Sequence, residues 1–124
     1  MIFWYYWGMK RKTIRNHKDF FTTRDGPGIA NNCCVIKIKP AKIPGDARYG
    51  LIASKRLFRT AVIRNRAKRI ARDWIAFNED FMMDQFDYIF ILREPVLSCN
   101  RDLGRKKIAR SFEKLSETYS DGAK

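Results

Sequence analysis

The sequence is poor in the side chains that protein-borne catalysis and metal binding require. It contains one histidine, His17, and three cysteines, none of them in a CxxC or Cys/His ligand spacing. Neither a zinc site nor a disulfide framework is indicated, and no paired-carboxylate or metal-ligand cluster stands out. We expect His17 to be a surface residue and Cys33, Cys34 and Cys99 to be structural and reduced. These absences argue against a basic nuclease that works without a partner.

Acidic residues are also scarce. The chain has 13 Asp and Glu against 26 Lys and Arg, which gives a net charge of +13. The excess is local, because residues 1–72 hold 18 basic and 3 acidic residues whereas residues 73–124 hold 8 and 10. A polarised charge of this kind steers a protein toward phosphate backbones. We therefore expect an RNA partner, the alternative being a highly solvated surface with no partner.

No apolar run is long enough to span a bilayer. Residues 1–8 are apolar, but they lack the basic region, the length and the cleavage site of a signal peptide. Because Met9 follows directly, we interpret residues 1–9 as a disordered extension or a mis-assigned start. Residues 10–119 are then a single domain and residues 120–124 a C-terminal tail. We expect the protein to be cytoplasmic.

Hydrophobic periodicity predicts a mixed α+β domain. Residues 33–39 alternate between apolar and polar side chains, and residues 87–92 form a continuous apolar run suited to a central strand. The remaining predicted elements are a strand over 48–54, helices over 60–78 and 102–119, and a shorter helix around 14–22. Gly104 should weaken the first turn of the last helix by about 1 kcal/mol relative to alanine.

The predicted helix over 60–78 has a cationic face opposite its apolar stripe. The stripe consists of Ile63, Ala67, Ile70 and Trp74. Like charges four residues apart destabilise an isolated helix by ~0.2–0.5 kcal/mol per pair, and no acidic residue lies among these cations. This pattern favours phosphates as the missing counter-charge. The face is built from one ridge of Arg64, Lys68 and Arg72, a neighbouring ridge of Asn65 and Arg69, and Arg66 toward the rim.

Two segments resemble the bacterial ribonuclease P protein component. They are YGLIASKR at 49–56 and AVIRNRAKRIAR at 61–72, and the similarity extends over about residues 12–117. The resemblance implies a single αβββαβα domain with a central mixed four-stranded sheet, similar to a ribosomal protein domain. It also implies a left-handed crossover before the Arg-Asn-Arg helix, contrary to the general right-handed rule.

The resemblance further implies two working surfaces. A cleft between the sheet and the first helix would bind the 5′ leader of precursor tRNA, with Phe20 stacking on a base and with Arg24 and Lys37 where the family has aromatics. Core packing is the alternative for Phe20, with Phe21 as the other candidate for the core. The second surface would bind the catalytic RNA through Ser54, Lys55, Arg56, Arg64, Asn65, Arg66, Lys68, Arg69 and Arg72.

In this family the RNA and its bound Mg²⁺ carry out phosphodiester cleavage, so the resemblance implies that the protein alone is inactive. It also implies no metal bound by the protein alone, no membrane contact and no obligate protein partner. We predict a ribonuclease P subunit that assists RNA-catalysed endonucleolytic removal of the leader. The alternative is a ribosomal or translation-associated RNA-binding protein without a nuclease role, which fits the charge but leaves the Arg-Asn-Arg helix unexplained.

Overall fold

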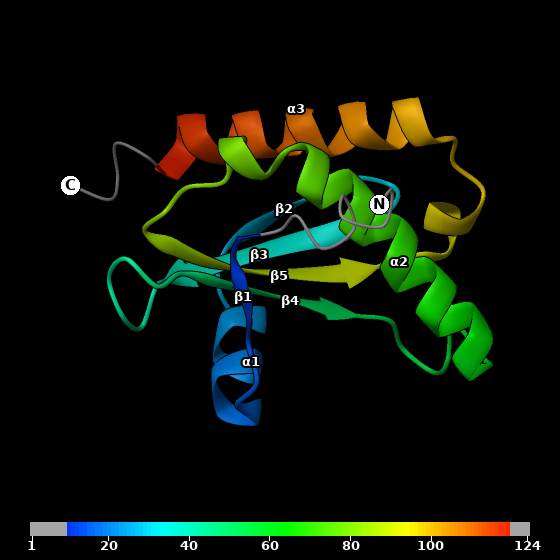
Figure 1. The fold of residues 1–124 in the computed structure, drawn as a ribbon, viewed down its shortest axis with the longest axis horizontal. Helices are drawn as coiled ribbons and strands as arrows, with labels where there is room; N and C mark the ends of the chain where they lie inside the picture. Colours follow the sequence, from blue (N-terminus) through cyan, green and yellow to red (C-terminus); the bar gives the residue numbers. More distant parts are fainter. Residues whose placement is uncertain (1–9, 120–124) are drawn as a thin grey trace.

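The computed structural model describes residues 10–119, with the exception of the His17 side chain. The expectations for residues 1–9, for residues 120–124 and for the His17 side chain lie outside these described residues. In chain order (Figure 1) the elements are β1 (Lys12–Thr13), α1 (His17–Arg24), β2 (Gly28–Ala30), β3 (Cys34–Pro40), β4 (Arg48–Ile52), α2 (Ala61–Phe77), η2 (Glu79–Phe81), β5 (Phe86–Leu92), η3 (Glu94–Leu97) and α3 (Arg101–Tyr119).

The strands form one mixed sheet in the order β1-β4-β5-β3-β2. β3 is antiparallel to β2 and β5, whereas β4 is parallel to β1 and β5. α2 lies in the chain between the parallel neighbours β4 and β5, so it belongs to a crossover connection. The left-handed sense of that crossover stays a prediction. The predicted α+β class is confirmed. The sheet has one strand more than the predicted four, because β1 is two residues long, which is too short to produce a periodic pattern.

The helices cover the sheet on both faces. Figure 1 shows α2 and α3 on one side of the sheet and α1 on the other. The main core lies on the α2 and α3 side, where Trp74, Tyr88, Phe90 and Phe112 are all buried. The rings of Tyr88 and Phe112 meet edge to face with centroids 5.6 Å apart, a geometry that adds to the energy of burial. No helix among residues 10–119 is long and apolar enough to cross a membrane.

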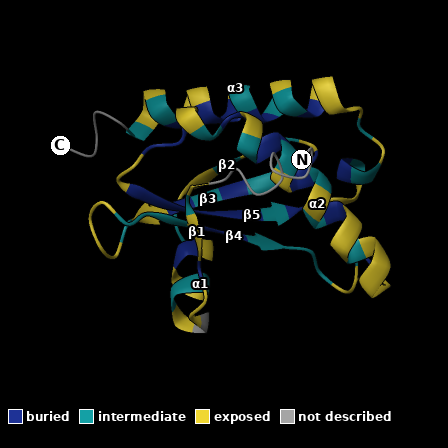
Figure 2. Cartoon of the chain, viewed as in Figure 1, coloured by how far each residue is buried: buried dark blue, intermediate teal, exposed yellow. Residues whose placement is uncertain are grey.

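α2 begins at a side-chain cap and buries only its later turns. The Thr60 hydroxyl accepts a hydrogen bond from the Ile63 N–H at 3.1 Å, which satisfies one free donor of the first turn. The predicted place of Ile63 in the buried stripe is wrong, because 37% of this residue is exposed. Figure 2 shows the reason, since the start of α2 projects past the sheet. The buried residues of α2 are Ala67, Ala71, Trp74 and Ile75.

The other boundary differences also have local causes. β4 ends at Ile52, two residues before the predicted end, because the chain turns at Ser54. α1 begins at His17 rather than at Ile14, since Asn16 caps the helix by accepting a hydrogen bond from the Lys18 N–H at 2.8 Å. Ile14 is buried in the segment that precedes the cap. Periodicity therefore predicts the types of these elements better than their ends.

Candidate RNA-binding surfaces

A tight turn between β4 and α2 presents two exposed cations. The Ser54 hydroxyl accepts a hydrogen bond from the Leu57 N–H at 3.3 Å, and the Ser54 carbonyl accepts one from the Phe58 N–H at 2.9 Å. Phe58 is fully buried and fastens the turn to the core. Lys55 and Arg56 lie between these anchors with their side chains exposed. The turn therefore places both cations next to the start of α2.

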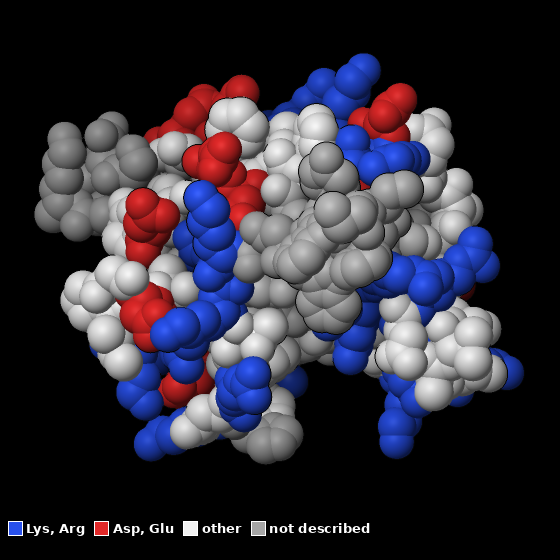
Figure 3. All heavy atoms as spheres, viewed as in Figure 1, with Lys and Arg blue, Asp and Glu red and all other residues white. Residues whose placement is uncertain are grey.

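The polar side of α2 continues this cationic area, which we call the α2 surface. Its members are exposed, apart from the half-buried Lys68. Within residues 10–119 none of its cations forms an ion pair or a side-chain hydrogen bond. Figure 3 shows basic side chains around the start of α2, at the lower right, and acidic ones mainly in the left half of the view. The α2 surface comprises Lys55, Arg56, Asn65, Arg66, Lys68, Arg69 and Arg72.

Arg64 differs from the rest of the predicted cationic face. Its side chain is half-buried, and Nη1 donates hydrogen bonds to the carbonyls of Phe58 at 3.0 Å and Arg59 at 3.3 Å. These bonds tie the first turn of α2 to the segment that precedes it. Arg64 therefore shapes the α2 surface as well as adding charge to it.

Several cations elsewhere in the described chain are bound to carboxylates. Arg48 bridges Asp19 at 3.1 Å and Asp87 at 3.0 Å, and Arg105 pairs with Asp73 at 3.0 Å. Such charges are already neutralised within the fold. Unlike these cations, those of the α2 surface remain available to an external anion.

The second predicted surface is the face of the sheet on which α1 lies. Phe20 projects from α1 onto β4 at Gly50, so closely that a Cβ at position 50 would lie 2.7 Å from the Phe20 ring. The same Cβ would lie 2.8 Å from Cδ1 of Ile89 in β5. Glycine is therefore required for the ring to reach the sheet. Phe20 nevertheless remains only half-buried, so it packs on the sheet without being enclosed in the core.

An apolar row crosses this face of the sheet next to Phe20. Gly50 pairs with Ile89, and the next pair along the same face is Ile52 with Ile91. Ile91 in turn pairs with Val35, and Val35 with Ala30. We call these four residues, Ile52, Ile91, Val35 and Ala30, the sheet row. All four are partly or fully exposed, because α1 covers the other end of this face.

The structure brings Lys37 to the sheet row but places Arg24 in a different contact. Lys37 pairs with Ile89 in β3, on the face that carries Phe20, and is half-buried. The Arg24 guanidinium lies 4.5 Å from the centroid of the Phe21 ring, and Phe21 is 49% exposed. The proposed core role for Phe21 is wrong, because Phe20 is the aromatic of α1 that turns toward the sheet.

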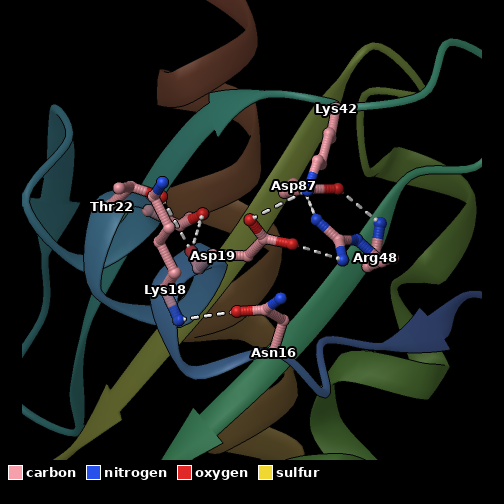
Figure 4. A network of polar contacts seen from close by, with 8 residues as sticks. Asn16, Lys18, Asp19, Thr22, Lys42, Arg48 and Asp87 are labelled. Atoms are coloured by element: carbon pink, nitrogen blue, oxygen red, sulfur yellow. Dashed lines mark hydrogen bonds and ion pairs between the residues drawn. The ribbon is translucent and has the colours of Figure 1, made fainter.

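A partly buried ionic network fixes α1 against this face (Figure 4). Asp19 of α1 meets Arg48 of β4, which also binds Asp87 of β5, and Lys42 lies 3.5 Å from Asp19. The hydrogen bond from Arg48 lowers the pKa of the Asp19 carboxyl, with further lowering by Lys42. The network holds α1 in the position that sets Phe20 on Gly50.

Residues 10–119 contain no cluster of three or more His, Cys, Asp or Glu that could hold a metal ion. Burial raises the pKa of the Cys33 thiol to about 11 and that of the Cys34 thiol to about 12, so both remain protonated at neutral pH. The geometry supports binding of an anionic polymer on two surfaces.

Comparison with known proteins agrees with this geometry. The family model for ribonuclease P matches residues 9–116. The chain is 34% identical over 85 residues to the ribonuclease P protein component of Lactobacillus delbrueckii, covering 68% of this chain and 70% of that one. It is 32% identical over 105 residues to the ribonuclease P protein component of Shouchella clausii, covering 84% of this chain and 82% of that one.

Solved structures give the same result. The ribonuclease P protein of Staphylococcus aureus superposes with a TM-score of 0.68 at 25% identity, covering 84% of this chain and 94% of that one. The ribonuclease P protein from Thermotoga maritima superposes with a TM-score of 0.70 at 22% identity, covering 84% of this chain and 97% of that one. At 22% identity, the similarity to the Thermotoga maritima protein supports the fold alone.

The sheet row is the part of the candidate site that sequence reasoning missed. In the run from Asp87 to Leu92, alternate residues face the two sides of the sheet. A continuous apolar run predicts burial on both faces, and the main core does cover one of them. The other face is open at Ile91, because α1 is eight residues long and reaches only part of the sheet. Pairing register, which the sequence does not reveal, is needed to find the row.

Proposed function

We propose that this chain, which belongs to the ribonuclease P protein family, binds the catalytic RNA through its α2 surface and the 5′ leader of precursor tRNA through its sheet row. The observation that carries the first assignment is the set of cations without anionic partners among the described residues. Phosphates would supply those partners, and release of their counterions would drive binding. A cytoplasmic location suits this role.

The sheet row suits a leader of variable sequence. Phe20 is a half-buried aromatic that would offer its ring to a base, and the row beside it is aliphatic. Stacking on such a surface accepts any base, because every base has a π-face, whereas hydrogen-bond readout would demand one sequence. Lys37 supplies a positive charge for the leader backbone. The two surfaces meet at the end of β4, where Ile52 is followed by the turn that carries Lys55.

The protein's contribution to cleavage is positioning and charge neutralisation. The α2 surface contains cations and one amide but no carboxylate, so its residues do not fit Mg²⁺, which prefers oxygen ligands. We assign the metal to the catalytic RNA. By holding substrate and RNA together, the protein would convert a bimolecular encounter into an oriented one and reduce repulsion between their phosphates.

Reconstitution tests this proposal. The purified chain should leave a leader-bearing precursor tRNA intact, whereas the chain with a ribonuclease P RNA at low Mg²⁺ should release the leader and a mature 5′ end. Low Mg²⁺ is chosen because the protein's cations then matter most. Metal-dependent cleavage by the chain without RNA, or no stimulation of the RNA by the chain, would overturn the proposed role.

A further inference from the structure

A groove of about 310 Å³ lies between α3 and the edge strand β2. Its wall on α3 is formed by Lys106, Lys107, Arg110 and Lys114, and its opposite wall by the segment from Ile29 to Asn32. The groove lies across the β2 edge from the sheet row, and it is separate from the α2 surface. Neither proposed surface accounts for it.

The groove carries positive charge without acidic compensation. No Asp or Glu is among the described residues that line it. Lys106, Arg110 and Lys114 are exposed and, within residues 10–119, form no ion pair or side-chain hydrogen bond. Lys107 donates a hydrogen bond to the Asn32 side chain at 2.6 Å and braces the two walls. The α2 surface has the same pattern of uncompensated cations.

The sheet row leads into this groove. The row runs from Ile52 on β4 through β5 and β3 to Ala30 on β2, and Ala30 also lines the groove. At the same corner Arg93, which follows β5, donates a hydrogen bond to the Asn31 carbonyl at 3.5 Å. The four strands that carry the row span ~14 Å across the sheet at the usual distance between neighbouring strands. An extended strand of RNA lying along the row would therefore leave the sheet at the mouth of the groove.

The direction of such a strand follows from the sheet order. The β4 end of the row adjoins the turn to the α2 surface, where the catalytic RNA and the cleavage site would lie, and β2 is the opposite edge. We infer that the groove between α3 and β2 binds the phosphate backbone of the distal part of the leader, beyond the nucleotides on the sheet row. The inference rests on the proposed leader role of the sheet row.

Leader length gives the test. Binding of precursor tRNAs with leaders of about 5 and about 20 nucleotides to the reconstituted holoenzyme would be measured, beside mature tRNA. The groove variant is Lys106→Gln/Arg110→Gln/Lys114→Gln. A control variant, Lys10→Gln/Lys12→Gln/Arg101→Gln, removes the same charge from exposed positions outside the groove. Circular dichroism and melting curves would establish that both variants are folded.

The groove variant should bind the long-leader precursor on the order of tenfold more weakly, with a salt slope flatter by about 2, because three phosphates of a single strand are no longer neutralised. Its affinity for the short-leader precursor should match that of the control variant. Equal affinity of the two variants for the long leader, or an equal loss for both leader lengths, would overturn the inference. If the wild-type holoenzyme bound mature tRNA as tightly as the short-leader precursor, the proposed leader role itself would fail.

Discussion

Gly104 of α3 lies directly against the indole of Trp74 in α2. A Cβ at position 104 would lie 2.1 Å from Cε2 and 2.2 Å from Cζ2 of that ring. The indole cannot move away easily, since Trp74 is only 2% exposed. The glycine that reduces the intrinsic helix propensity of α3 is thus the residue that lets α3 approach α2.

Gly104→Ala should lower the free energy of unfolding, although alanine is the better helix former. The higher helix propensity of alanine would stabilise the fold by about 1 kcal/mol. Forcing a methyl group into a filled core typically costs about 1–3 kcal/mol. A Cβ only 2.1 Å from the indole should bring the cost to the upper part of that range. Urea denaturation measures the difference, with the exposed Glu113→Ala as a neutral control on the same helix. A stabilised Gly104→Ala would show that the two helices are not so closely packed.

Asp19→Asn should destabilise the protein in a pH-dependent way. Because Arg48 lowers the pKa of Asp19 below its ordinary value of 3.8, the carboxylate stabilises the fold fully above that value, and this contribution is lost as the pH falls through the lowered pKa. The stability difference between wild type and variant should be constant from neutral pH down to about pH 5 and shrink in more acidic solution. Urea midpoints between pH 2.5 and 7 measure it, and Glu113→Gln should show no comparable trend.

Arg64→Gln should lower stability by roughly 1–2 kcal/mol, because the variant loses charge-assisted hydrogen bonds to the carbonyls of Phe58 and Arg59. The exposed Arg66→Gln removes the same charge two residues away and should leave the unfolding midpoint unchanged. Thermal and urea unfolding of the two variants side by side make the comparison. Equal midpoints would mean that Arg64 contributes only charge.

Ile63 and Arg64 show where sequence periodicity stops being informative. The spacing correctly predicts a helix and the burial of Ala67 and Trp74, because those turns lie over the sheet. It assigns Ile63 to the same stripe and Arg64 to the solvated face, since period alone does not tell where the neighbouring sheet ends. The first turn of α2 projects past the edge of the sheet, so Ile63 is exposed. In the same turn Arg64 donates hydrogen bonds to the carbonyls of Phe58 and Arg59.

Phe20→Ala should weaken binding of precursor tRNA to the holoenzyme by roughly 1–3 kcal/mol through loss of one base stack, and binding of mature tRNA should not change. Phe20→Leu keeps an apolar side chain over Gly50 without the ring, so it should fold normally and show most of the same defect. The equilibrium affinity of each variant holoenzyme for precursor and mature tRNA distinguishes stacking on a base from packing on the sheet. If Phe20→Leu binds like wild type, the ring is a packing element only.

The sequence predicts only part of the surface that we propose for leader binding. Phe20 and Lys37 are expected there and do lie on one face, but their shared platform depends on the pairing of Ile52, Ile91 and Val35. Residues from three strands become neighbours only through sheet register, and no local pattern encodes it. Arg24 is expected on the same surface, and its contact with Phe21 depends on how α1 is turned, which the ionic network of Asp19 fixes.

The salt dependence of binding tests whether the α2 surface is the main contact to the catalytic RNA. The variant Lys68→Gln/Arg69→Gln/Arg72→Gln leaves Arg64 in place, so it should keep its melting temperature. Affinity for the ribonuclease P RNA would be measured between 50 and 400 mM salt against the charge-matched Lys10→Gln/Lys12→Gln/Arg101→Gln control. We expect a slope of log K against log salt flatter by ~2–3, about 0.7–0.9 for each phosphate that is no longer neutralised, and an unchanged slope for the control. Equal slopes for both variants and wild type would contradict the assignment of this surface.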